Sequence, residues 1–293
     1  MAVDKLVDST QLDSDLTSVA NAIRTKGGTS AQLAFPAGFV QAIGDIQTGG
    51  TDTLLLALCR QLTGDIVLNV NPTISSSTAS TFRELLADNP IDSLKVTGLT
   101  VCPERFAYQQ LGAGYGHASV MKSIEMNSSS IGNEVCAYAR KLTSAHFPNA
   151  YLEKVNYGWQ GSRAFINCTS LTDVYIPLFP TIQEQMFLGC SALAVLDLPS
   201  VTRIRARGFE SCSALETIVL RASSVAVLEN TSAFAGTRFA SGGVGGTIYI
   251  PETLYNHLGD STSDDYKTAT NWATIDGYGT ITWAKIEGSV YDT

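Results

Sequence analysis

Residues 165–177 (FINCTSLTDVYIP), 187–199 (FLGCSALAVLDLP) and 209–221 (FESCSALETIVLR) align without a gap and are evenly spaced along the chain. They share the pattern F-x-x-C-x-x-L-x-x-V-x-I-P. A strict period of this length indicates a solenoid, because each unit adds one turn and cannot bury its apolar face without neighbours. The V-x-I pair alternates as in a short strand. We therefore expect a mainly β solenoid whose structural core contains Phe165, Cys168, Leu171, Phe187, Cys190, Leu193, Phe209, Cys212 and Leu215.

Weaker copies extend the array toward the N-terminus. Ala139 takes the Cys position of one copy and Cys136 takes its Phe position, while Phe106 follows an earlier copy and Ile66 begins the first. The steps between copies are unequal, and the longest run from Ile91 to Met121 and from Leu142 to Leu171. These long steps contain insertions, which project from a solenoid as loops. The residues at the Leu position are Ile91, Met121, Leu142, Leu171, Leu193 and Leu215.

The pattern resembles the BspA-like class of bacterial leucine-rich repeats, whose units read AF-x-x-C-x-x-L-x-x-I-x-I-P. The resemblance is strong over residues 160–222 and degenerate over roughly 60–160. It implies a leucine-rich-repeat coil of right hand with a period of about 22 residues. Residues 245–251 look like the closing strand of such arrays, and residues 266–272 (YKTATNW) are similar to the segment that follows it. A helical stretch and a strand at 280–283 would then form a C-terminal α+β cap.

The N-terminal 47 residues differ from the repeats. Apolar residues at helical spacing predict one short helix, with a second after Pro36, and the small apolar stripe needs a partner surface. This attachment face comprises Leu12, Leu16, Val19 and Ile23. The predicted organisation is an attachment module (1–47), a linker (48–51), the repeat solenoid (52–250) and the cap (251–293).

Residues 12–43 (LDSDLTSVANAIRTKGGTSAQLAFPAGFVQAI) resemble a module at the start of tail and baseplate-associated proteins of phages and prophages that infect Gram-positive gut bacteria. The resemblance implies a structural and adhesive part of a tail (fibre, tip or baseplate) in the virion. The expected partners are other tail or baseplate proteins, further copies of the chain and a bacterial surface protein or glycan. The alternative is a secreted leucine-rich-repeat adhesin at the bacterial surface. Acids at Asp4 and Asp8, where an export signal has a basic patch, favour the tail.

Composition excludes several classes of function. The net charge is −8, the pI is about 4.9 and only 16% of residues are charged, so neither nucleic acid nor an anionic membrane surface is an expected partner. The longest apolar run, residues 54–59, is too short to span a bilayer. No G-x-S-x-G elbow or outstanding acidic pair is present, so we expect no enzyme.

No cofactor or metal is expected either. The three histidines lack zinc-site spacing, residues 112–116 do not open a βαβ helix, and residues 259–265 lack the order of a calcium loop and predict a solvated turn. Cys168, Cys190 and Cys212 fall in one column. A metal ladder or disulfides are conceivable there, but small apolar wedges are the favoured interpretation.

Aromatic residues mark the two insertions. The first carries Tyr115 and His117, and the second carries Tyr151, Tyr157 and Trp159. Aromatic side chains on loops suit sugar stacking or protein contact, which makes these five the candidate receptor-binding residues. The alternative is that their rings pack back onto the solenoid.

Overall fold

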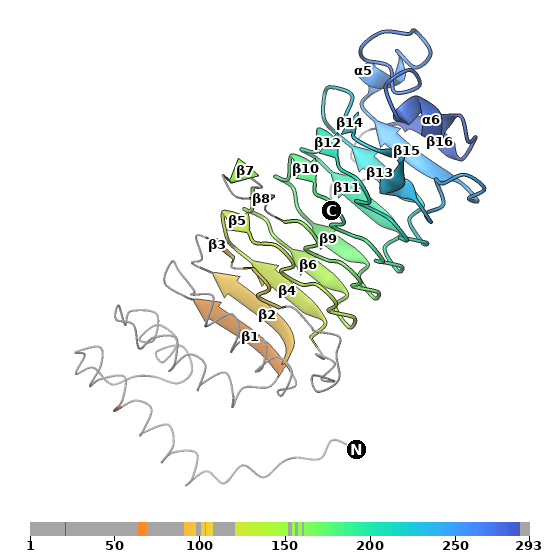
Figure 1. Ribbon diagram of the computed structural model, residues 1–293. Coiled ribbons are helices and arrows are strands. Elements are labelled where there is room, and N and C mark those ends of the chain that lie inside the picture. The colour runs from red at the N-terminus through yellow and green to blue at the C-terminus, as the bar shows by residue number, and fades with distance from the viewer. Residues whose placement is uncertain are drawn as a thin grey trace.

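The computed structural model describes residues 64–69, 91–97, 101–102, 104–107, 121–151, 154–155, 158–159 and 161–287, together with Asn21. Within them the chain makes successive turns that stack along one direction (Figure 1). We call this part of the molecule the repeat stack. Apart from Asn21, the predicted attachment module lies outside the described residues, as do the linker at 48–51 and the attachment face of Leu12, Leu16, Val19 and Ile23.

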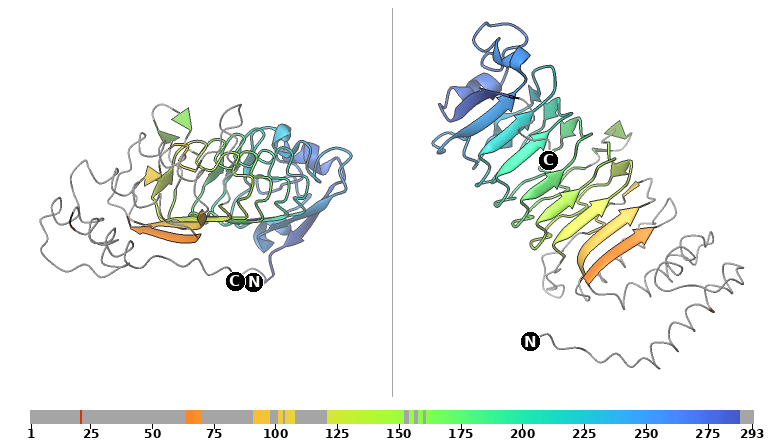
Figure 2. Two further views of the ribbon diagram at one scale, coloured as in Figure 1. Left: turned by 90° about the horizontal axis from the view of Figure 1, so that it is seen from below. Right: turned by 180° about the vertical axis from the view of Figure 1, so that it is seen from behind.

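One side of the repeat stack is a row of parallel strands. The sheet order is β1-β2-β4-β6-β9, followed by β11-β13-β15-β16, and β9 contacts β11. Figure 2 shows this row along one side of the stack and the turns along the other. The strands are β1 (Gly64–Asn69), β2 (Ile91–Thr97), β4 (Ser123–Met126), β6 (Ser144–His146), β9 (Asp173–Tyr175), β11 (Val195–Leu198), β13 (Thr217–Leu220), β15 (Gly246–Ile250) and β16 (Ile281–Lys285).

Shorter strands form a second set of parallel ladders. Strand β3 (Val101–Cys102) pairs with β5 (Ser130–Ile131), and β12 (Arg203–Ile204) pairs with both β10 (Thr181–Ile182) and β14 (Val227–Leu228). Strands β7 (Lys154–Val155) and β8 (Gly158–Trp159) form an antiparallel pair. The second predicted insertion therefore contains an antiparallel pair of short strands.

Strand pairing agrees with the unequal repeat lengths. Positions three residues after the predicted Leu markers pair in register from β2 to β9, at Leu94, Ile124, Ala145 and Val174. At the Phe position the backbone N–H of Cys136 donates to the carbonyl of Ala164, just as the N–H of Phe165 donates to that of Met186. Cys136 thus occupies the Phe position, as predicted.

The earlier turn differs from the prediction by one residue. The N–H of Ala107 donates to the carbonyl of Val135, which aligns Ala107, rather than Phe106, with Cys136. Phe106 is fully buried one position earlier, where later copies carry Ala164. The large and small side chains of the two positions have exchanged places, so the turn still buries one ring.

The core is a column of stacked rings. All nine residues expected at the repeat core are fully buried. Phe187 stacks on Phe165 at 5.2 Å between ring centroids and on Phe209 at 5.9 Å, with interplanar angles of 13° and 12°. Phe147 meets Phe165 edge-on, at 61°. Because Cys136 is too small to fill the Phe position of its turn, a ring from the end of β6 extends the column instead.

Cysteines form a second buried column beside the rings. The five described cysteines are free thiols with no solvent exposure, which agrees with the apolar-wedge interpretation. Each thiol of the column lies 3.0 Å from the Phe-position carbonyl of the preceding turn, in the pairs Cys168 to Cys136, Cys190 to Phe165 and Cys212 to Phe187. Burial raises the pKa of Cys168 to about 12, so the thiol keeps the proton that it donates.

Aromatic side chains also close the C-terminal end. Trp272, on α6 (Trp272–Asp276), contacts the ring of Phe234 on the 3₁₀ helix η1 (Thr231–Phe234) and donates from Nε1 to the carbonyl of Ala226 at 2.6 Å. The Tyr266 hydroxyl accepts from the N–H of Ala226 at 3.0 Å. The short helix α5 (Glu252–Tyr255) follows β15. Strand β16 then pairs with β15, so the cap adds a strand to the repeat sheet.

The expectation of a solvated turn over residues 259–265 is wrong in part. Residues 261–264 are exposed, but the Asp265 side chain is buried. Its carboxylate accepts hydrogen bonds from the backbone N–H groups of Ser261 at 3.1 Å and Lys267 at 2.8 Å. Burial opposes ionisation, yet these bonds and one from Gly259 outweigh it and lower the pKa of Asp265.

Candidate functional site

The outer surface of the long strands is the first candidate site. We call it the sheet face. The x residue of each V-x-I pair points away from the core, because side chains alternate along a strand. Register therefore aligns one outward residue per turn, in the order Lys95, Glu125, His146 and Tyr175, and Asp197 holds the same place one repeat later.

Charges on the sheet face are matched in pairs. Lys95 Nζ lies 2.7 Å from Glu125, and Lys122 Nζ lies 2.9 Å from Asp92. Farther along, the guanidinium of Arg221 donates to both carboxylate oxygens of Asp197 at 2.8 to 3.0 Å. Such partly exposed pairs add little stability. They hold their side chains in fixed places and leave the face nearly neutral.

Four polar and aromatic side chains gather between β6 and β9. This β6–β9 cluster consists of Ser144, His146, Asp173 and Tyr175. The Ser144 hydroxyl donates to Asp173 Oδ2 at 2.8 Å, and His146 Nε2 lies 2.7 Å from the same oxygen. The rings of His146 and Tyr175 meet edge to face at 5.7 Å. Tyr175 remains 50% exposed, so the cluster presents a ring whose orientation is fixed from one side.

The cluster does not have the geometry of a nucleophilic triad. A catalytic histidine uses one ring nitrogen for the serine and the other for the carboxylate. Here the nitrogen that faces Asp173 is also the nitrogen that lies 3.3 Å from Ser144 Oγ. Since a carboxylate only accepts, Nε2 carries a proton and cannot take one from Ser144. The cluster therefore lacks the base that a serine nucleophile of a triad requires.

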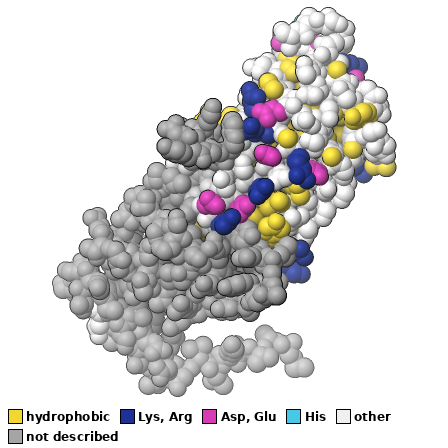
Figure 3. Space-filling model, viewed as in Figure 1, with side chains coloured by type: hydrophobic (Ala, Val, Ile, Leu, Met, Phe, Trp, Pro, Cys, Tyr) yellow, Lys and Arg dark blue, Asp and Glu magenta, His cyan; other side chains and the backbone are white. Residues whose placement is uncertain are grey.

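The turns on the opposite side carry a row of charged and polar side chains, and its blue and magenta members are visible in Figure 3. Glu134 contacts Arg105 at 2.6 Å and Arg163 at 3.5 Å in the turns on either side of it. Arg163 also donates to the side-chain oxygen of Gln185 at 2.6 Å. These residues and Arg207 hold equivalent places with φ between 54° and 60°. We call this row the turn ladder.

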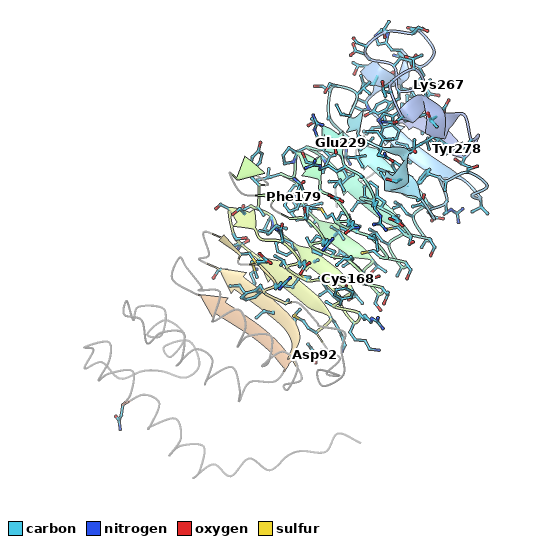
Figure 4. All side chains as sticks on the ribbon, in the orientation of Figure 1. Asp92, Cys168, Phe179, Glu229, Lys267 and Tyr278 are labelled. Carbon is cyan, nitrogen blue, oxygen red and sulfur yellow. The ribbon has the colours of Figure 1, made fainter. Side chains whose placement is uncertain are left out.

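A second polar row lies beside the turn ladder. Glu229, labelled in Figure 4, accepts from Arg203 at 3.0 Å and from Arg205 at 3.1 Å. The pairs span strands β12 and β14, so they connect adjacent turns. In both rows, side chains of adjacent turns contact each other, and these contacts help to fix one turn against the next.

The predicted loop residues are only partly described. Tyr115, His117 and Tyr157 lie outside the described residues. Trp159 lies in β8 opposite Lys154, and its side chain also falls outside them. Tyr151 is 47% exposed, and its N–H donates to the carbonyl of Ser129. Of the five side chains, the described residues thus include that of Tyr151, and whether the five bind a receptor stays a prediction.

Sequence reasoning missed the β6–β9 cluster. The repeat pattern includes Tyr175, but it assigns a role only to the inward neighbours of that residue. The alternation of the V-x-I pair was the available signal, since it places the x residue on the surface. His146 precedes Tyr175 by one full repeat, so register alone predicts that the two are neighbours.

The C-terminal end of the sheet face carries a groove of about 440 Å³. It is lined by Val219, Tyr249, Tyr255, Trp283, Ala284, Lys285, Ile286 and Glu287. In the described part of the chain, no group of three or more His, Cys, Asp or Glu side chains is placed to hold a metal. No described helix has the length and apolar character needed to cross a membrane.

Comparisons with known proteins agree with the repeat fold. Residues 117–241 match the model of the BspA type leucine rich repeat region in six copies. A crystal structure of a leucine-rich repeat protein from Bacteroides ovatus ATCC 8483 is similar, with 16% identity and a TM-score of 0.43, over 78% of this chain and 55% of that one. A leucine rich cell surface protein from Faecalibacterium prausnitzii A2-165 has 16% identity and a TM-score of 0.28, over 61% of this chain and 58% of that one.

The chain thus spans little more than half the length of these two structures. The sequence has no significant match among curated proteins. The family model matches the repeats that resemble BspA-like units, and its range includes the turns of the ring and cysteine columns. Over residues 117–241 the chain is therefore similar to the BspA type leucine rich repeat region.

Proposed function

We propose that the chain is a non-enzymatic adhesive component of a bacteriophage or prophage-like tail, and that its repeat stack contacts the bacterial cell surface. The observation that supports contact most directly is the sheet face. Tyr175, half exposed, stands in a row of paired charges on consecutive strands. Stacked repeats present long continuous surfaces of this kind, which favour binding over catalysis.

The tail setting rests on the resemblance of residues 12–43 to modules of tail and baseplate-associated proteins. In this proposal residues 1–47 mount the chain on other tail or baseplate proteins, and several copies assemble together in the virion. Tyr115, His117, Tyr151, Tyr157 and Trp159 stay candidates for additional receptor contacts from the insertions. No cofactor is required, and the bound molecule is a surface protein or a glycan.

A secreted bacterial surface adhesin is the second candidate. The BspA-type repeat region is equally compatible with it, because the same sheet face would serve recognition from a cell surface as well as from a particle. The two candidates share the binding activity and differ in where the chain is found.

Two measurements test the proposal. In the first, the fluorescently labelled full chain is mixed with intact Gram-positive gut bacteria and bound fluorescence is counted by flow cytometry. Saturable binding to some strains is expected, and no binding to any strain would contradict an adhesive function. In the second, antibodies against the chain are applied to purified particles and to intact producing cells. Labelling of tails supports the first candidate, and labelling of the cell surface without particles supports the second.

A further inference from the structure

The β6–β9 cluster has the components of a sugar-binding subsite. Tyr175 lies in the central residue row of the sheet face, where its backbone is fixed by pairing with His146 on β6. The residue is 50% exposed, and its ring contacts that of His146 edge to face, which favours this orientation. A preoriented ring loses little conformational entropy when a flat ligand stacks on it. The apolar C–H face of a pyranose ring is such a ligand.

Hydrogen-bonding groups stand at the distance of a sugar's hydroxyls from this ring. Asp173 shares the outward side of β9 with Tyr175, about 7 Å away along the strand. Its Oδ2 already accepts hydrogen bonds from the Ser144 hydroxyl and from His146 Nε2, and these bonds hold the carboxylate in place. A carboxylate has about four acceptor positions, so capacity remains for a ligand hydroxyl. Its side chain is 58% exposed and accessible to such a ligand.

Charge on the sheet face favours a neutral ligand. Lys95, Lys122 and Arg221 each face a carboxylate at 2.7 to 2.9 Å, so the cations that an anionic polymer would need are already engaged. An anionic ligand would also approach the carboxylate of Asp173. Phosphate-rich or carboxylate-rich polymers are therefore disfavoured at this place.

The sparse apolar surface favours a glycan over a protein. On β4, β6, β9 and β11, the large hydrophobic side chains that point outward and are well exposed are Tyr175 and Val195, and the apolar groove lies farther along the face, at β13, β15 and β16. A stable protein interface buries about 800 Å² on each partner around an apolar centre, which two such side chains do not provide. A sugar needs only one ring and a few polar groups.

We infer that the β6–β9 cluster binds a neutral glycan of the bacterial surface, with a sugar ring stacked on Tyr175 and its hydroxyls hydrogen-bonded to Asp173. The inference rests on the proposed adhesive function and specifies the ligand class for that site. It predicts that the aromatic ring, not the tyrosine hydroxyl, supplies most of the binding.

Variants of the full chain test the cluster on a bacterial strain that the native protein binds. Tyr175→Ala is expected to weaken binding at least tenfold, while Tyr175→Phe keeps it within about threefold. Tyr278→Ala is the matched control, because Tyr278 is also exposed, at 40%, and lies in the C-terminal turn after α6 (Figure 4). It is expected to bind as the native chain does. Equal thermal unfolding of all variants shows that folding is not the cause.

Chemical treatment of the cells identifies the class of ligand. Periodate, which cleaves vicinal diols of sugars, is expected to abolish binding, and protease treatment is expected to leave it. Purified neutral cell-wall polysaccharide from the same strain should compete with cells for the native chain but not for Tyr175→Ala. Loss of binding after protease but not periodate, or full binding by Tyr175→Ala, would overturn the inference and leave the adhesive function standing. Absence of any native binding would refute the adhesive function itself.

Discussion

Replacing Phe187 by alanine is the sharpest test of how the repeat stack is held together. The ring is fully buried and stacks on two others, at 5.2 and 5.9 Å. Burial of a Phe side chain contributes about 1.5 to 3 kcal/mol, and each ring pair adds about 0.5 to 1.5 kcal/mol. We therefore expect Phe187→Ala to lower the free energy of unfolding by about 3 to 5 kcal/mol, the range measured for such cavities.

Urea unfolding followed by circular dichroism measures this loss, and hydrogen exchange locates it. Because each turn contacts only its neighbours, protection should fall mainly in the turns of Phe165 and Phe209 and much less in β16. Phe187→Leu is the control, because it keeps most of the volume but loses both ring pairs, and it should cost about 1 to 3 kcal/mol. A loss below about 1 kcal/mol for Phe187→Ala would show that the ring column is not the principal core.

Four further results are expected. Glu134→Lys should lower the free energy of unfolding by about 2 kcal/mol, because it replaces a 15% exposed carboxylate between two arginines by a cation. Glu104→Lys is the control, since the side chain of Glu104 is 56% exposed, and it should change the stability by less than about 0.5 kcal/mol. The described cysteines should resist iodoacetamide at pH 8 until urea is added, because all are buried and burial raises the pKa of Cys102, Cys136 and Cys190. Mass spectrometry of the unreduced protein should show no disulfides. Folding lowers the pKa of Asp265, so the stability that its carboxylate contributes is present above the unfolded-state pKa and is lost as the pH falls through the folded-state pKa. Asp265→Asn should therefore cost about 1 kcal/mol of stability at pH 7. The difference in melting temperature between this variant and the native chain should disappear in acid. Deleting residues 1–47 should leave thermal unfolding of the repeat stack unchanged and abolish incorporation into particles; a truncated chain that still incorporates would place the mounting elsewhere, for instance in the cap.

The repeat core could be predicted from the sequence because its signal is local. A Phe, a Cys and a Leu recur at fixed offsets in each strict repeat, and each buries its side chain in the same environment as its copies. The closing strand was also predictable, since Ile248 and Trp283 continue the alternation of the repeat strands. Periodicity identifies positions that must be apolar, and a core demands little else.

Contacts between unlike positions could not be predicted in the same way. Phe147 extends the ring column although it belongs to a strand end, because Cys136 leaves space that a neighbouring element can fill. Asp265 is one of several acids in a polar turn of the sequence, and only the folded backbone brings N–H groups together on it. The bonding of one side chain depends on the backbone path of the whole turn, which the residue types alone do not specify.

The separation of core and surface positions explains how one stack can carry a recognition site. Backbone hydrogen bonds at the Phe position and inward V and I side chains fix the register of each turn. The x residue between them is free of this role, so Tyr175 and Asp197 occupy equivalent places with unrelated chemistry. The core then holds neighbouring x residues about 4.8 Å apart from strand to strand, whatever their identity. A binding surface built from such residues can change its ligand without changing its fold, which is why the proposed glycan ligand is to be sought in the outward row and not in the repeat motif.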